Sequence, residues 1–186
     1  METNNNNKSV VTLETLIHNL RIEDNRNLTL TRTMQGVMWG VVTIYAIILV
    51  VKSIMGAPWP ETIGGFVVML AFVLFALFFR NYSKEYKSVD YGLPTTQMLS
   101  KAIQRYQIFQ RRSIFLLIPL ALEDLGLTLF MHDFFNGQHA ITNLLIAHAY
   151  FIGLLAIGFF VGYLIWKKRH KPLRDYAIKL LKEIQS

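Results

Sequence analysis

Apolar residues occur in four long runs that short polar segments separate. Each run approaches or exceeds the roughly 18 to 20 residues that an α-helix needs to cross a hydrocarbon core of about 30 Å. The runs cover residues 34–55, 62–79, 113–131 and 141–166. This pattern predicts an all-α fold, an integral membrane four-helix bundle.

Three further segments have apolar residues at helical spacing but are too short and too polar to cross a membrane. They cover residues 10–22, 95–110 and 172–185. Pro94 and Pro172 suit helix starts, where proline's missing N–H costs nothing. We expect three short amphipathic helices that pack on each other or on the membrane, or that dock a partner. NNNN at 4–7 and DNRN at 24–27 are typical of flexible, solvated connections.

The composition agrees with a membrane location, since 53% of the 186 residues are hydrophobic. The chain has no cysteine, which excludes a disulfide framework, a thiolate nucleophile and a cysteine-based metal site. The first thirty residues lack the basic start, apolar core and cleavage site of a secretion signal. We therefore expect the first apolar run to be retained.

Lysine and arginine are distributed with a strong bias. Four precede the first run, seven lie within residues 80–112 and seven follow residue 166, whereas Lys52 stands alone after the first run and residues 132–140 hold none. If all four runs cross, eighteen of the nineteen fall on one side, which predicts both termini in the cytoplasm. Because these basic residues flank apolar runs, they indicate membrane topology and do not indicate a nucleic-acid partner.

The expected organisation has three parts. Residues 1–33 form a cytoplasmic segment with an amphipathic helix, residues 34–166 form the four-span bundle with a cytoplasmic loop at 80–112, and residues 167–186 form a cytoplasmic helix.

The third run carries two adjacent acids, Glu123 and Asp124. Each costs about 2.5 to 3.5 kcal/mol near the centre of a span, so this helix needs help from its neighbours. Counting from the 132–140 connection at 1.5 Å per residue puts both acids level with His148, and Tyr45 lies at a similar depth. We expect an intramembrane polar cluster of these four residues. It is open to three interpretations: a hydrogen-bonded structural contact, a proton or ion pathway, or a metal site.

Adjacent helical residues point about 100° apart, so only one acid can face His148 directly. Pro119 is expected to kink this helix one turn before the acids. In the following connection, His132, Asp133 and His139 could bind zinc or copper, but their spacing matches no established ligand pattern. We expect these three side chains to solvate the turn, and we predict no metal and no cofactor.

Small residues four apart occur on two runs. The pairs are Gly36 with Gly40, Gly158 with Gly162, and Ala149 with Gly153. Such pairs let helix backbones approach closely, either within the bundle or between copies of the chain. A homo-oligomer is therefore one expectation.

The sequence contains no phosphate-binding loop, dinucleotide fingerprint, HExxH, GxSxG or CxxC motif. We therefore expect a protein that is not an enzyme.

Two stretches, YGLPTTQMLSKAIQRYQIFQRRS at 91–113 and KPLRDYAIKLLKEI at 171–184, resemble small polytopic inner-membrane proteins of Gram-negative bacteria. Some of those proteins are thought to lie beside alternative sigma factors and to influence them. The resemblance implies a membrane-anchored regulator, and it carries over no site residue.

The first interpretation is an interaction or regulatory protein that binds a cytoplasmic protein partner through its short helices. The alternative is a small, oligomeric, proton-coupled carrier or channel that uses Glu123, Asp124, His148 and Tyr45.

Overall fold

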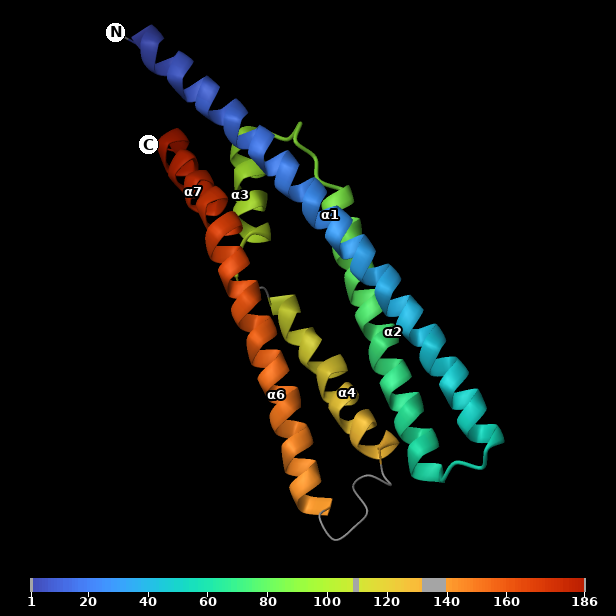
Figure 1. Cartoon of the computed structure of the whole chain (residues 1–186). Helices are drawn as coiled ribbons and strands as arrows, with labels where there is room; N and C mark the ends of the chain where they lie inside the picture. The colour runs from blue at the N-terminus through green and yellow to red at the C-terminus, as the bar shows by residue number, and fades with distance from the viewer. Residues whose placement is uncertain (1, 109–110, 132–139, 186) are drawn as a thin grey trace. The chain divides into compact units, whose positions relative to one another are not determined.

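The computed structural model describes residues 2–108, 111–131 and 140–185, and it is helical in almost all of them. No strand occurs within these ranges. The elements are α1 (Glu2–Ile54), α2 (Trp59–Lys87), α3 (Thr95–Arg105), the 3₁₀-helix η1 (Arg111–Leu116), α4 (Leu117–Phe130), α6 (Ala140–Ile165), the π-helix η2 (Trp166–His170) and α7 (Lys171–Gln185) (Figure 1).

Four helical stretches are long and apolar enough to cross a membrane. They are Leu13–Ile54, Trp59–Lys87, Ser113–Phe130 and Ala140–Gln185. Each covers one of the four predicted apolar runs to within one residue, so the prediction of an all-helical chain with four possible spans is confirmed.

α1 and α2 are longer than the apolar runs that they carry. α1 is unbroken from Glu2 to Ile54 and therefore passes through residue 33, where the sequence pattern places a boundary. α2 continues to Lys87, eight residues beyond the predicted end of its run. The chain divides into two compact units, which share these long helices: unit 1 comprises Met1–Thr29, Ser83–Gln110 and Phe160–Ser186, and unit 2 comprises Leu30–Tyr82 and Arg111–Phe159.

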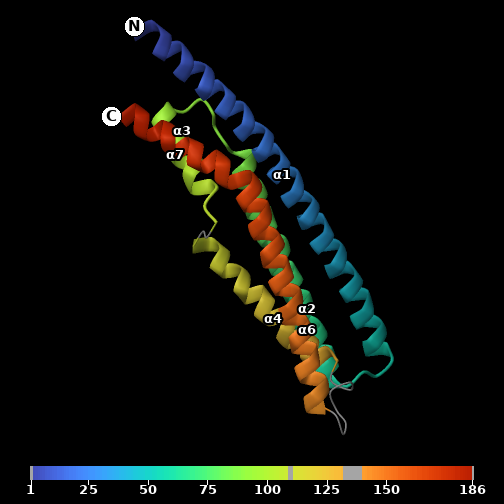
Figure 2. The ribbon, with the colours of Figure 1, turned by 60° about the vertical axis from the view of Figure 1, so that its left-hand side comes forward.

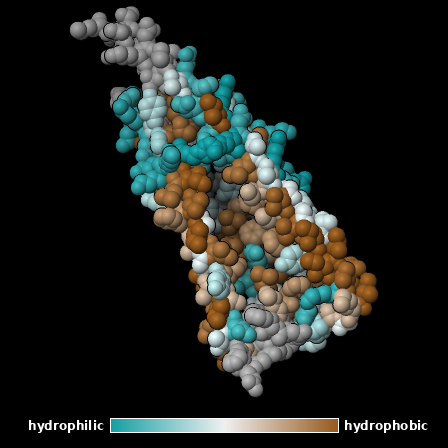
Figure 3. All heavy atoms as spheres, in the orientation of Figure 1, coloured by the Kyte–Doolittle hydropathy of each residue, from teal (hydrophilic) through white to brown (hydrophobic). Residues whose placement is uncertain are grey.

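The core of unit 1 is built by the three predicted amphipathic segments, which pack on each other. Its buried members come from the start of α1, from α3 with the residue that follows it, and from α7: Leu16, Leu20, Met98, Leu99, Ala102, Tyr106, Ala177 and Leu180. α3 and α7 lie side by side (Figure 2). Hydrophilic side chains gather over the outside of this unit in the face that Figure 3 shows. Each segment thus buries its apolar stripe, which is the main source of stability for short helices.

The expectation of a flexible connection at 24–27 is wrong. These residues are α-helical, and Asp24 and Asn27 are buried. The NNNN run at 4–7 is also helical. The sequence pattern misleads here because polar residues that favour loops can be held in a helix when buried partners satisfy them.

Both prolines that the sequence places at helix starts lie at the beginning of an α-helical segment. Pro94 directly precedes α3, and Pro172 is the second residue of α7. Because Pro172 offers no N–H to the preceding turn, the helical ladder is interrupted there, and η2 takes a π-helical turn just before it.

In unit 2, α2 and α4 touch through their backbones at two glycines. A methyl group on Gly64 would lie 2.7 Å from the carbonyl oxygen of Gly126, and one on Gly126 would lie 2.7 Å from the amide nitrogen of Val68. Val68 is fully buried at this crossing. Only glycine allows the two helices to approach so closely.

The small-residue pairs singled out in the sequence do not make such crossings. A methyl group on Gly36, Gly40, Gly153, Gly158 or Gly162 would meet nothing within 4 Å. Ala149 is exposed. The interpretation that these pairs bring helices together inside the bundle is therefore wrong for the part of the chain that the structure describes, and an oligomer contact stays untested.

Pro119, which is expected to kink its helix, lies in the first turn of α4. η1 ends at Leu116, and α4 begins at Leu117, so Pro119 is the third residue of an α-helix. The N–H groups of the first helical turn have no carbonyl acceptor within the helix, so a proline, which lacks an N–H, is tolerated there.

The turn between α1 and α2 is closed by an ion pair. Lys52 bonds Glu61, which is buried in the first turn of α2, and the Lys52 Nζ lies 4.5 Å from the ring centre of Phe130. Gly56 has a φ of 77°, which the tight turn requires and which glycine adopts without strain. Lys52, the lone basic residue of this connection, is therefore ion-paired within unit 2.

Candidate functional sites

The structure brings Asp124 and His148 together in unit 2. Asp124 on α4 places its Oδ1 2.8 Å from the Nδ1 of His148 on α6. About a third of each side chain is exposed, 36% for Asp124 and 35% for His148. Of the two adjacent acids, Asp124 is thus the one that faces the imidazole. A carboxylate beside an imidazole can share or pass a proton, and the pairing reduces the cost of placing either group in a membrane.

Glu123 has a different electrostatic neighbour. It interacts electrostatically with Tyr45 of α1. The Tyr45 ring packs near Phe72 of α2 and Phe130 of α4, at centroid distances of 5.7 and 5.9 Å. Of the four predicted residues, Asp124 and His148 therefore form a direct contact, whereas Glu123 and Tyr45 are linked only by an electrostatic interaction.

The three weak metal-ligand candidates, His132, Asp133 and His139, lie outside the described residues. Within residues 2–108, 111–131 and 140–185, no group of three or more histidines and acids is arranged to hold a metal ion.

Unit 1 contains a second polar cluster, which the sequence did not point to. Asp24 of α1 is only 3% exposed. The Tyr106 hydroxyl donates to its Oδ1 at 2.6 Å, the Tyr91 hydroxyl donates to its Oδ2, and an Arg105 nitrogen lies 3.5 Å from Oδ2. Asp24 is thus held by three groups from the segment between α2 and the end of α3.

Glu23, the neighbour of Asp24, is held from the other side by η2. Its Oε1 lies 3.2 Å from the Nε2 of His170 and 3.8 Å from an Arg169 nitrogen. Trp166, also of η2, donates its indole N–H to the carbonyl oxygen of Tyr106 at 2.9 Å. We call Glu23, Asp24, Tyr91, Arg105, Tyr106, Arg169 and His170 the acid cluster. It joins all three segments of unit 1.

Burial controls the protonation of the acid cluster. Removal from water, together with the Asp24 carboxylate, raises the pKa of Tyr106 and of Tyr91, so both phenols keep the protons that they donate. Burial lowers the pKa of His170 below its ordinary value, although Glu23 opposes this effect. The histidine therefore favours its neutral form at neutral pH.

One signal in the sequence could have found this cluster. Glu23 and Asp24 follow Leu20 by three and four residues, so they continue the apolar stripe of Leu16 and Leu20 on the same helical face. Acids on the buried face of a helix require partners. Those partners come from more than sixty residues away, which one sequence cannot show.

Comparisons with protein-family models, with curated proteins and with solved structures find no match to this chain. The fold alone therefore defines its class. With four helices able to span a membrane by length and composition, the chain is a multi-pass α-helical membrane protein.

Proposed function

We propose that this chain is a non-enzymatic, regulatory protein of a bacterial inner membrane that binds a cytoplasmic protein through unit 1. The observation that carries the proposal is the assembly of unit 1 from three distant segments, with its own apolar core and the acid cluster. Tails and loops that only connect spans need no such core. A folded unit of this kind is suited to present a fixed surface to a partner.

The resemblance supports the same proposal. The stretch at 91–113 contains α3, and the stretch at 171–184 lies within α7, and these two helices pack against each other. Because the apolar faces of both helices are used inside unit 1, a partner would bind their outer, polar faces. The resemblance implies that the chain regulates transcription initiation. The partner would then be an alternative sigma factor, which the chain holds at the membrane.

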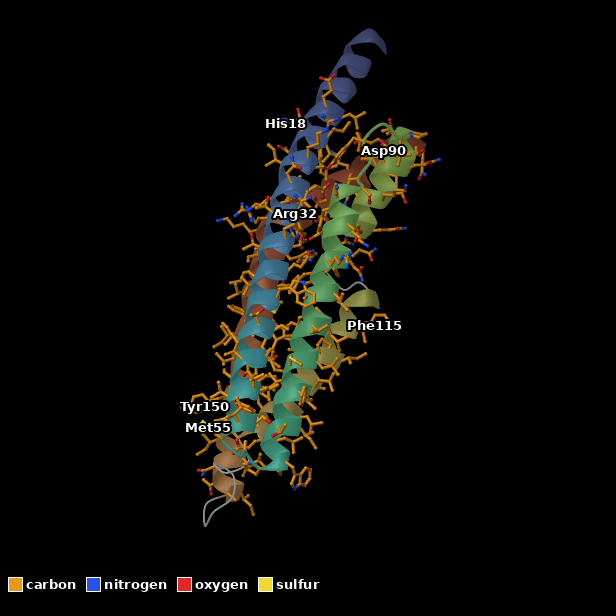
Figure 4. All side chains as sticks on the ribbon, turned by 90° about the vertical axis from the view of Figure 1, so that its right-hand side faces the viewer. His18, Arg32, Met55, Asp90, Phe115 and Tyr150 are labelled. Carbon is orange, nitrogen blue, oxygen red and sulfur yellow. The ribbon has the colours of Figure 1, made fainter. Side chains whose placement is uncertain are left out.

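The proposed orientation rests on the charge bias and puts unit 1 in the cytoplasm. The chain has no native cysteine, so single Ser→Cys variants report topology directly. Ser53 lies in the last turn of α1, two residues before the exposed Met55 (Figure 4). We expect the Ser53→Cys variant to react with an impermeant maleimide in intact cells. Ser88→Cys, close to Asp90, is the matched variant and should react only after lysis. The opposite pattern would place unit 1 outside the cytoplasm and end the proposal.

Site-specific photo-crosslinking tests the partner. A photoreactive residue at exposed His18, Lys101 or Lys179 samples α1, α3 and α7 of unit 1 in turn. We expect at least one position to form an adduct with a soluble protein in the native host. Tyr150 of α6, which is 72% exposed, is the control and should react only with lipid or membrane protein (Figure 4). Adducts from Tyr150 alone, or no soluble adduct from the other three, would contradict the proposal.

The 2.8 Å contact between Asp124 and His148 favours a second candidate, a proton-coupled carrier or channel. In that case, the Glu123→Gln, Asp124→Asn double variant should lose proton flux in liposomes at least tenfold. Thr142→Val, which removes an exposed polar group from the same helix as His148, should not change the flux. If the double variant keeps its soluble crosslinks and no flux is seen in either protein, the regulatory function stands and the acids are structural.

A further inference from the structure

The basic run KKRHK at 167–171 divides into two sets of side chains with different surroundings. Arg169 and His170 are directed to Glu23 inside unit 1. Lys167, Lys168 and Lys171 are exposed. Among the described residues, none of these three lysines has a carboxylate within ion-pair distance. Within the part of the chain that the structure describes, these three charges are therefore accessible to a ligand from outside.

The depth of Lys167 and Lys168 relative to the membrane follows from the apolar helix that precedes them. The apolar helix α6 ends at Ile165, so the two lysines follow within about 5 Å along the helix axis. A charge so close to the end of a membrane-spanning helix lies at the level of the lipid headgroups. This holds whichever way α7 continues, whereas Lys179 and Lys182 lie at least eleven residues beyond Lys168 and are under no such constraint.

The excess charge of the chain is concentrated in the same unit. Unit 1 contains fourteen lysines and arginines and eight acids, a net of +6, whereas unit 2 contains five and four, a net of +1; together they account for the +7 of the whole chain. Two of the eight acids, Glu23 and Asp24, are buried and bonded within the acid cluster. The exposed surface is therefore more basic than the totals show.

We propose that Lys167 and Lys168, with Lys171 beside them, form a binding site for the phosphate headgroup of an anionic phospholipid. Opposite charge, exposure and depth all match this ligand, and a zwitterionic headgroup lacks the net charge that the lysines attract. Bound lipid would add a further interaction to η2. In η2, Trp166 contacts the residue that follows α3, and His170 contacts α1. Anionic lipid therefore stabilises unit 1 as well as anchoring the chain.

Native mass spectrometry of the full chain in a neutral detergent tests the site, with phosphatidylglycerol and phosphatidylcholine as probes. We expect the wild-type chain to retain phosphatidylglycerol more tightly than phosphatidylcholine. Lys167→Gln, Lys168→Gln should lower the phosphatidylglycerol affinity roughly thirty-fold, from the contribution of each lysine near an anionic surface. Lys179→Gln, Lys182→Gln is the control, because it removes two positive charges from exposed lysines of α7, although Lys179 lies 3.9 Å from Glu183. It should lower the phosphatidylglycerol affinity less than threefold, because charges separated by more than about 10 Å are largely screened.

Each other outcome overturns the proposal. Equal losses of phosphatidylglycerol affinity in the two variants would show that only net charge matters. No loss of affinity in either variant would show that Lys167 and Lys168 do not bind the lipid. Inorganic phosphate that displaces phosphatidylglycerol at equal concentration would assign the site to a soluble anion. Thermal unfolding of both variants in detergent without added lipid establishes that each is folded, so that a loss of affinity is not a loss of structure.

Discussion

Gly64→Ala is expected to separate α2 from α4 and to lower the free energy of unfolding by about 3 kcal/mol, at the upper end of the usual cost of overpacking. The added methyl group would overlap the backbone of Leu129 and Phe130 as well as the carbonyl oxygen of Gly126. These atoms belong to a helix backbone and cannot turn aside as a side chain would. Titration of the detergent-solubilised protein with SDS, followed by circular dichroism, measures the effect.

The chain offers matched controls for this substitution. Gly40→Ala makes the same change in α1, where the new methyl group meets nothing within 4 Å, and it should change stability by less than about 1 kcal/mol. Gly126→Ala should behave like Gly64→Ala, because it overlaps the amide nitrogen of Val68. If Gly64→Ala were as stable as Gly40→Ala, the close crossing of α2 and α4 would be wrong.

Asp24→Ala should destabilise unit 1 by about 3 to 5 kcal/mol, the usual cost of removing one partner of a buried ion pair. The substitution takes the acceptor from the Tyr91 and Tyr106 hydroxyls, and it removes the carboxylate beside Arg105, whose side chain is only 8% exposed. Limited proteolysis and thermal unfolding in detergent should show that the connection around α3 opens well below the wild-type temperature.

Glu14→Ala is the control for this second prediction. It removes a carboxylate from the same helix, but Glu14 is exposed, so its loss should change stability by less than about 0.5 kcal/mol. A double-mutant cycle of Asp24→Ala with Tyr106→Phe should give a coupling energy above about 1 kcal/mol, since the two groups share a buried hydrogen bond. Additive effects would mean that the two side chains do not meet.

The helices and the possible spans could be predicted because they depend on local patterns. Long apolar runs need only their own backbone hydrogen bonds to be satisfied in a membrane. The level of Glu123, Asp124 and His148 could also be counted, because rise per residue is fixed. The choice of Asp124 as the partner of His148 could not, since it depends on the rotation of α4 about its axis.

The acid cluster and the glycine crossing show where local reasoning stops. The residues of DNRN favour loops and predict one, yet Asp24 is held in a helix by Tyr91, Arg105 and Tyr106 from a distant segment. Gly64 and Gly126 do not form a motif within one helix, because each meets the other across two helices. Pairs spaced four residues apart, such as Gly36 and Gly40, match the small-residue motif, yet a methyl group on either would have no neighbour within 4 Å.

The sequence by itself determined that the chain is all-helical, that four of its segments are able to cross a membrane, and that three others carry an apolar stripe. These properties follow from hydropathy and from the period of the α-helix, which each segment has alone. Only the tertiary structure decided what each stripe and each charge meets: Leu20 and Leu99 in one core, Glu23 beside His170, and Gly64 against Gly126. Such pairings depend on the distance between segments in space, and that distance is set by packing of the whole unit.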